Sequence, residues 1–194
     1  ILLNQVEIEV RNMIESRIGE DQAGIWTGLI FISKNYMVFL NALLTLYVLP
    51  QFAGIFDKEG FYKEVKSIYK TLLPLFGFGM ILVYLFRDIA IGLLFKDDYT
   101  AMSPLFKWQL LGDFIRLAAV ILGYQFLAKK MVYNFVFTEI LSVGLFYVFS
   151  IYFIDIYGLE GVVIAHFWRY VIYLIVVFFL VFRFFNKKKK ARNG

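Results

Sequence analysis

PLFKWQLLGDFIRLAAVILGYQFL, the stretch Pro104–Leu127, decides the fold class of this chain. It is as long and as apolar as an α-helix that crosses a bilayer, which needs about 20 residues. Asp113 and Arg116 nevertheless lie near its middle, on a helical face shared with Gln109, Gly112, Gly123 and Tyr124. A charge at the bilayer centre costs about 2.5–3.5 kcal/mol on insertion scales, so such residues usually face a protein interior or a wet cavity. The stretch therefore predicts a membrane helix with a polar, functional face.

Composition extends this prediction to the whole chain. Hydrophobic residues make up 61% of the sequence and aromatic residues 20%, against about 45–50% apolar residues in ordinary soluble domains. The apolar runs are continuous and about twice as long as the alternating strands of roughly 10 residues in membrane β-barrels. The sequence therefore predicts an all-α polytopic membrane helix bundle. The absence of cysteine excludes disulfides, thiolate catalysis and cysteine-ligated zinc.

Five stretches are predicted to span the membrane within one bundle, residues 1–186: about 23–49, 67–86, 104–127, 131–154 and 161–185. Polar turns are expected at Gly19–Gly24 and Asp155–Glu160, and a charged connection at Pro50–Lys66. The short apolar piece Ile89–Phe95 is expected in the interface or as an extension of the second helix. Residues 187–194 are expected to form a basic cytoplasmic tail.

Ile1–Gly19 is too charged to insert alone, and two interpretations stay open. It is either an amphipathic surface helix or a cavity-lining membrane helix shielded by its neighbours, cut at its start. Glu7, Arg11 and Glu15 recur at four-residue spacing and could form a ladder along one helical face. The lack of an initiator methionine and of a signal segment leads us to expect the C-terminal part of a longer protein.

The basic residues predict the orientation of the spans. With the C-terminus in the cytoplasm, twelve lysines and arginines fall on the inner side: Lys58, Lys63, Lys66, Lys70, Lys129, Lys130, Arg183, Lys187–Lys190 and Arg192. Only four fall outside, Arg11, Arg17, Arg87 and Lys96. This is the bias of the positive-inside rule. The net charge of +5 is thus explained by membrane edges, and no nucleic-acid motif is present.

The ionisable residues inside the spans are the candidates for function: Lys34, Lys107, Asp113, Arg116, Glu139, His166 and Arg169. Lys107 is only three residues into its span, so we expect it to reach the outer surface. Asp113 and Arg116 could neutralise each other, or Arg116 could bridge Asp113 and Glu139. Without Lys107, three bases face two acids. This excess favours an anionic substrate such as a phosphate or pyrophosphate, which arginine binds in a bidentate manner.

Other chemistries find less support in the sequence. His166 shares a helical face with Arg169 and Tyr173, and it is either a satisfied hydrogen-bonding residue or a proton relay. A membrane enzyme would need clustered carboxylates for a metal or a histidine-based acid–base pair. Asp97–Asp98 is adjacent but is expected in a solvated outer loop. We therefore predict a transporter with no cofactor and no metal site, rather than an enzyme.

Three blocks of the chain resemble a known family: RIGEDQAGIWTGLIFIS (Arg17–Ser33), LLFKDDYTAMSPLFKWQLLGDFIRLAA (Leu93–Ala119) and YGLEGVVIAHFWRY (Tyr157–Tyr170). Together they resemble the C-terminal half of Wzx-type O-antigen flippases, in the multidrug/oligosaccharidyl-lipid/polysaccharide exporter superfamily. The resemblance runs from Arg11 to about Phe185. It implies twelve helices in two six-helix bundles, with this chain as the second bundle and Ile1–Gly19 as the seventh helix, on the cavity wall.

The resemblance also implies a function. The substrate would be an undecaprenyl-pyrophosphate-linked oligosaccharide, an O-antigen or common-antigen unit, moved from the cytoplasmic to the periplasmic leaflet of the bacterial inner membrane by alternating access. Besides the lipid bilayer, glycan polymerase machinery is a candidate partner. The sequence before residue 1 should then repeat the same six-segment layout.

In this hypothesis a cationic cavity holds the pyrophosphate. Lys34, Arg116, Arg169 and His166 are the predicted substrate-binding residues. Asp113 and Glu139 are predicted to orient Arg116 or to exchange ions or protons. Two alternatives remain open. One is an ion-coupled multidrug antiporter of the same superfamily; the other is a membrane polymerase or ligase, which would need a large soluble loop that this sequence lacks.

Overall fold

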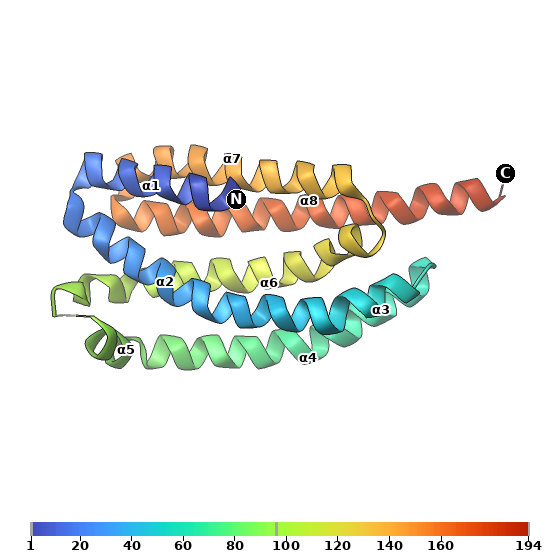
Figure 1. Cartoon of the computed structure of the whole chain (residues 1–194), viewed down its shortest axis with the longest axis horizontal. Helices are drawn as coiled ribbons and strands as arrows, with labels where there is room; N and C mark the ends of the chain where they lie inside the picture. The colour runs from blue at the N-terminus through green and yellow to red at the C-terminus, as the bar shows by residue number, and fades with distance from the viewer. Residues whose placement is uncertain (1, 96, 194) are drawn as a thin grey trace.

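The computed structural model describes the backbone of residues 2–95 and 97–193 and the side chains of residues 3–95 and 99–186. Every element in this part of the chain is helical (Figure 1): α1 (Leu2–Ile18), α2 (Glu20–Leu43), the π-helix η1 (Leu44–Val48), α3 (Leu49–Gly54), α4 (Lys58–Leu85), α5 (Arg87–Leu94), the 3₁₀-helix η2 (Asp97–Leu105), α6 (Phe106–Ala128), α7 (Val132–Tyr157) and α8 (Leu159–Asn193).

Among the described residues, five helical segments are long and apolar enough to cross a membrane: Glu20–Gly54, Lys58–Leu94, Tyr99–Ala128, Val132–Tyr157 and Leu159–Asn186. The predicted all-α polytopic membrane bundle is therefore confirmed. The side chains of the predicted basic tail, residues 187–194, and of Asp97–Asp98 lie outside the described residues.

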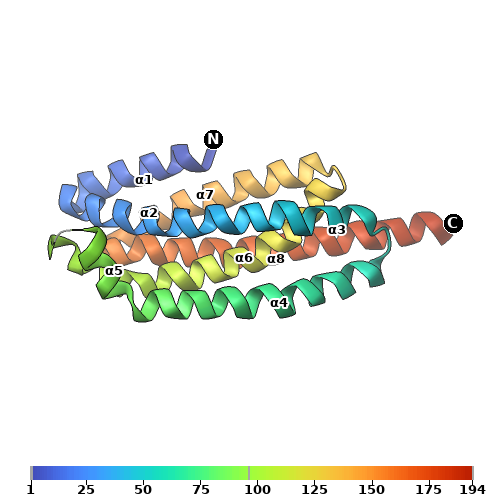
Figure 2. The ribbon, with the colours of Figure 1, turned by 60° about the horizontal axis from the view of Figure 1, so that its bottom comes forward.

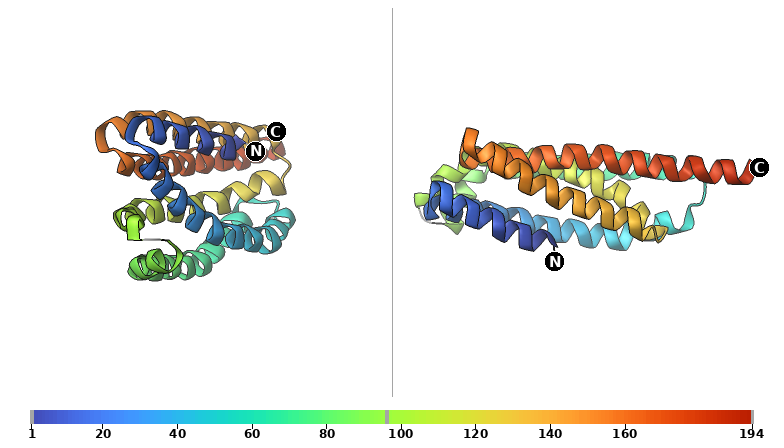
Figure 3. Two further views of the ribbon diagram at one scale, coloured as in Figure 1. Left: turned by 60° about the vertical axis from the view of Figure 1, so that its left-hand side comes forward. Right: turned by 90° about the horizontal axis from the view of Figure 1, so that it is seen from above.

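The helices pack in layers around α6. Helix α6 packs along α8, and α8 packs along α7, while α1 lies against α2 and α7. Helix α4 contacts α6 from the opposite side (Figures 1 and 2). The far end of α8 projects beyond the rest of the bundle (Figure 3). The polar-faced apolar stretch Pro104–Leu127 thus forms most of the central helix of the structure, α6.

The outward-facing side of helix α4 is apolar, as expected for a surface that contacts lipid. A stripe of its side chains is buried, at the three- and four-residue spacing of one helical face: Phe61, Val65, Ile68 and Leu72. Its outer face exposes large apolar side chains, including Leu75, Phe78, Ile81 and Leu85. Such a continuous exposed apolar surface is unfavourable in water but matches lipid chains.

The turns between spans are shorter than predicted. The expected turn at Gly19–Gly24 is wrong, because only Gly19 leaves the helical conformation, with a φ of 104°. The acidic residues Glu20 and Asp21 instead occupy the first turn of α2, where negative charge interacts favourably with the helix dipole. The turn expected at Asp155–Glu160 likewise reduces to Gly158, with a φ of 58°.

The expected connection Pro50–Lys66 is also wrong. Pro50 lies in the first turn of α3, and α4 already begins at Lys58. The Asp57 carboxylate caps α4 by accepting a hydrogen bond from the Gly60 backbone N–H at 2.7 Å. The piece Ile89–Phe95 falls largely in α5, which forms one membrane-length segment with α4. It therefore extends the second helix, one of its two predicted placements.

Helix α1 is held by charges on both neighbours. Arg11 pairs with Glu15 at 2.6 Å, which is half of the predicted ladder. Glu7 does not join the ladder but faces α2, and Arg17 pairs with Asp155 of α7 at 2.6 Å. These contacts place the first stretch inside the bundle rather than apart from it.

Gly112 sets the distance between α6 and α8. A Cβ atom at this position would lie 2.4 Å from His166 Cδ2 and 3.2 Å from the backbone Cα of Phe167. Contacts this short require the neighbouring helix to move. The glycine therefore permits the close packing that brings the polar residues of α6 and α8 together.

We predict that Gly112→Ala lowers the melting temperature of the protein in detergent, because overpacking costs about 1–3 kcal/mol. Gly79→Ala on α4 is the matched control, since no atom lies within 4 Å of its added Cβ. Both substitutions favour helix formation equally. Equal melting temperatures for the two variants would contradict the close packing at Gly112.

Candidate functional site

The Asp113 carboxylate is the centre of a buried hydrogen-bond network and has no solvent exposure. Its Oδ2 accepts from Ser33 Oγ at 2.6 Å, from the Tyr36 hydroxyl and from Gln109 Nε2 at 3.1 Å. Its Oδ1 is 2.9 Å from His166 Nε2. Burying a carboxylate is costly unless it is hydrogen-bonded, and donors from α2, α6 and α8 meet this requirement together.

His166 connects Asp113 to Arg169. Arg169 Nη2 lies 3.1 Å from His166 Nδ1, and a guanidinium can only donate. Nδ1 is therefore the unprotonated nitrogen, and Nε2 carries the hydrogen that it donates to Asp113 Oδ1. The result is a chain from guanidinium through a neutral imidazole to a carboxylate. Both ring nitrogens form hydrogen bonds. This geometry fits a satisfied hydrogen-bonding residue, which is one of the two roles predicted for His166; the other is a proton relay.

The Arg169 guanidinium is buried, with 2% of the residue exposed. It lies 4.3 Å from the ring centroids of both Phe146 and Tyr170, within the range of cation–π attraction. Nε and Nη1 have no hydrogen-bond partner among the residues that the structure describes. Unpaired donors on a buried cation are unfavourable. An acceptor that reached Nε and Nη1 would therefore gain two hydrogen bonds.

Arg116 does not occupy the predicted position. Within 4 Å it forms no ion pair with Asp113 or Glu139 in the described part of the chain, so the expected bridge is absent. The physical reason is that four donors already fill the Asp113 oxygens. The half-buried Arg116 guanidinium instead lies 5.5 Å from the Tyr170 ring centroid and interacts electrostatically with Arg169.

Lys34 is not a free cation either. Its Nζ lies 2.5 Å from Glu7 Oε2, so α1 supplies a counter-ion that lies outside the five spans. Glu7 also interacts electrostatically with Arg116 and Arg169. The predicted excess of three bases over two acids thus becomes a balance of three and three.

Glu139 lies apart from the Asp113 network. Its Oε1 accepts a hydrogen bond from the Tyr173 hydroxyl at 3.3 Å. Lys107 is exposed, and its Nζ is 5.2 Å from the Trp108 ring centroid, as an interfacial position would allow. No group of three or more histidine, cysteine or acidic residues that could hold a metal ion occurs within the described residues.

Three of the six predicted site residues lie in one buried network, and several of the partners of the predicted residues were not predicted. The structure brings together Asp113, His166 and Arg169, with Arg116 nearby. The missed partners are Ser33, Tyr36 and Glu7. Ser33 and Tyr36 are three residues apart in an apolar stretch, and this spacing places two hydroxyls on one helical face. That signal could have identified them.

Fold and site together define an all-α polytopic membrane protein with a polar network inside its helix bundle. Comparison with known proteins adds a more particular similarity. Over 166 residues the chain is 33% identical to the lipid III flippase of Escherichia coli (strain K12), and equally so to that of Shigella flexneri. The matched region covers 86% of this chain and 40% of each relative, so the chain spans about two fifths of their length.

No protein-family model matches the chain, and no solved structure does. The predicted resemblance to flippases is supported by these two relatives. Neither of them is named as an O-antigen flippase.

We predict that Asp113→Ala strongly lowers the melting temperature in detergent, because it leaves four donors without their acceptor. Each orphaned buried donor costs about 1–3 kcal/mol. Tyr36→Phe removes one donor and keeps the acceptor, so its cost should be only that of a single hydrogen bond to a charged group, about 1.5–3 kcal/mol. The network would not be the stabilising centre of the bundle if Asp113→Ala were as stable as Tyr36→Phe.

Proposed function

We propose that this chain is the second helix bundle of a flippase that moves a lipid-linked oligosaccharide across a bacterial inner membrane. The two lipid III flippases to which it is similar support this assignment. The substrate would be an undecaprenyl-pyrophosphate-linked unit, either O-antigen or common-antigen, passed from the cytoplasmic to the periplasmic leaflet by alternating access. The C-terminus would lie in the cytoplasm, in agreement with the distribution of basic residues.

The observation that carries the proposal is the buried Arg169 guanidinium, of which two donor nitrogens have no hydrogen-bond partner among the described residues. A planar guanidinium binds phosphate oxygens in a bidentate manner. Arg169 would supply such donors at a phosphate when the bundle opens. Arg116 is half-buried and close enough to Arg169 to repel it. An anion between the two arginines would relieve that repulsion.

Asp113 and His166 would act by positioning rather than by contact. His166 accepts a hydrogen bond from Arg169 and donates one to Asp113, so it would hold the guanidinium in one orientation. Protonation of Asp113 would remove one acceptor site from this network and loosen the contact between α2, α6 and α8. The carboxylate would in this way couple ion or proton exchange to movement. Glu139 would serve the same purpose through Tyr173.

Glu7 would act as an internal counter-ion in the empty transporter. It pairs with Lys34 and interacts with both arginines. A pyrophosphate group carries the same sign of charge, so it would compete with Glu7 for these cations. Substrate binding would thereby weaken the contact of α1 with α2 and favour movement of α1.

We expect Arg169→Gln and Arg116→Gln to lower surface glycan about ten- to a hundredfold in a strain that lacks its own flippase. This range follows from the roughly 1.5–3 kcal/mol of a hydrogen bond to a charged group. Lys107→Gln is the matched control, because this exposed lysine lies outside the network. Immunoblots of membrane fractions would verify equal protein levels, and Arg169→Lys would separate lost charge from lost geometry.

Full surface glycan in both arginine variants would eliminate the anion site. Normal glycan but raised drug sensitivity on deletion of the gene would favour the antiporter alternative.

Glu7→Gln should have the opposite effect on binding. Without the competing carboxylate, the purified protein should bind a pyrophosphate-linked lipid up to about fivefold more tightly, from the 0.2–1 kcal/mol of a partly exposed ion pair. Glu15→Gln removes the same charge from α1 but breaks only the exposed pair with Arg11, so its affinity should not change. Weaker binding by Glu7→Gln would show that Glu7 contacts the substrate instead of competing with it.

A further inference from the structure

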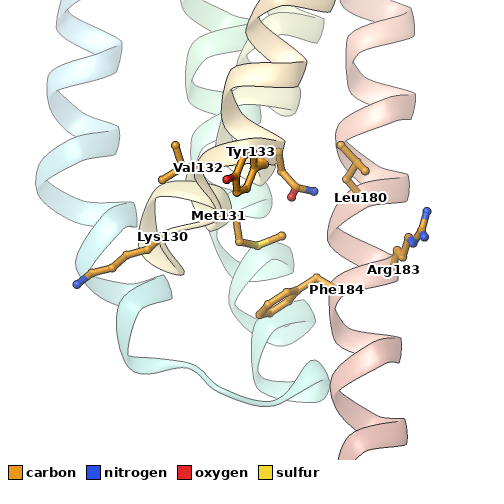
Figure 4. A pocket seen from close by; sticks show the side chains of 8 residues that line it. Lys130, Met131, Val132, Tyr133, Leu180, Arg183 and Phe184 are labelled. Atoms are coloured by element: carbon orange, nitrogen blue, oxygen red, sulfur yellow. The ribbon is translucent and has the colours of Figure 1, made fainter.

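A second feature lies at the opposite end of α8 from the Asp113 network. A cavity of about 550 Å³ opens between the start of α7 and the last membrane turns of α8 (Figure 4). Its walls include the apolar side chains of Met131, Val132, Leu180 and Phe184, and its rim carries Lys130 and Arg183. The proposed function uses none of these residues.

The two rim cations are available to a ligand. Both are exposed, and neither forms an ion pair with an acidic residue within 4 Å in the described part of the chain. Figure 4 shows Lys130 and Arg183 on opposite sides of the cavity, with Met131 and Phe184 between them. The cavity therefore combines an apolar floor with positive charge on two sides.

The position of Lys130 is determined by the backbone. Its φ is +53°, a left-handed conformation that a non-glycine residue rarely adopts. The Met131 N–H donates to the Phe126 carbonyl at 2.7 Å and closes the tight turn between α6 and α7. This turn places the backbone of Lys130 beside the cavity and leaves its side chain exposed.

The depth of the cavity indicates what kind of molecule would fill it. Lys129 and Lys130 come directly before the apolar stretch that begins α7, and Lys187–Lys190 follow that of α8. Basic residues gather at the membrane edges, so the cavity lies where hydrocarbon meets head groups. Tyr133 is 91% exposed, as in the aromatic belts of membrane proteins at this level. A molecule here would present acyl chains to the apolar wall and a polar group to the rim.

From this charge and depth we propose that the cavity binds an anionic glycerophospholipid of the bilayer. The long, exposed side chains of Lys130 and Arg183, which point away from the cavity in Figure 4, would turn toward the phosphate of the lipid, and an acyl chain would lie along Leu180 and Phe184. Basic pockets between membrane helices are known to bind anionic lipid head groups. The bound lipid would fill the space between α7 and α8.

Native mass spectrometry of the purified protein, titrated with phosphatidylglycerol or phosphatidylcholine, tests the proposal. The wild type should retain phosphatidylglycerol more tightly. In Lys130→Gln/Arg183→Gln its affinity should fall about fivefold for each cation removed, from the effect of a basic residue near an anionic lipid surface. Phosphatidylcholine binding should not change. The lipid-free melting temperature should stay the same, because both side chains are exposed.

The matched control is Lys63→Gln/Lys66→Gln, which removes the same charge from exposed positions of α4. An equal loss in the control would overturn the proposal, since the effect would then be general surface electrostatics. Unchanged phosphatidylglycerol binding in the rim variant would overturn it too. Displacement of the lipid by millimolar inorganic phosphate would also overturn it, because the site would then bind a free anion.

Discussion

The buried Asp113 carboxylate imposes the constraint on which the rest of the bundle depends. A carboxylate without access to water must be supplied with donors, and α6 alone offers only Gln109. Helix α2 supplies two hydroxyls and α8 supplies an imidazole. Helix contacts in lipid gain little from the hydrophobic effect, so polar contacts of this kind determine which helix faces which.

Arg116, Arg169 and Lys34 also need partners, and one of these partners comes from helix α1. Arg169 is hydrogen-bonded to a neutral histidine that in turn bonds Asp113, and its Nε and Nη1 have no hydrogen-bond partner in the described part of the chain. Lys34 pairs with Glu7, which α1 contributes from outside the five spans, and Arg116 interacts electrostatically with both Asp113 and Glu7. The ionisable side chains of the interior therefore balance in charge, three basic against three acidic. Their surroundings differ, because Arg116 and Arg169 have few acceptors nearby among the described residues, whereas both oxygens of Asp113 already accept hydrogen bonds.

The fold could be predicted well from the sequence because its signals are long and redundant. Continuous apolar runs define the membrane helices, and Gly158 marks one turn correctly. The turns are shorter than the polar residues suggest, because Glu20 and Lys58 lie in the first turns of helices, where polar residues are favoured or tolerated. The site was harder, because contacts between helices depend on rotation about each axis, which one sequence does not contain. Asp113, His166 and Arg169 were identified by polarity alone, whereas the pairing of Lys34 with Glu7 required the position of α1.

The π-helix η1, residues 44–48, interrupts the first membrane segment and brings Thr45 within 2.9 Å of the Tyr124 hydroxyl. A π-turn holds one residue more than an α-helical turn, so the segments before and after it are out of phase by about 100°. In evolutionary terms, this is where a single-residue insertion or deletion can be absorbed. A related chain one residue shorter here would keep the membrane span as a regular α-helix, and the residues of α3 would then face a different side of the bundle.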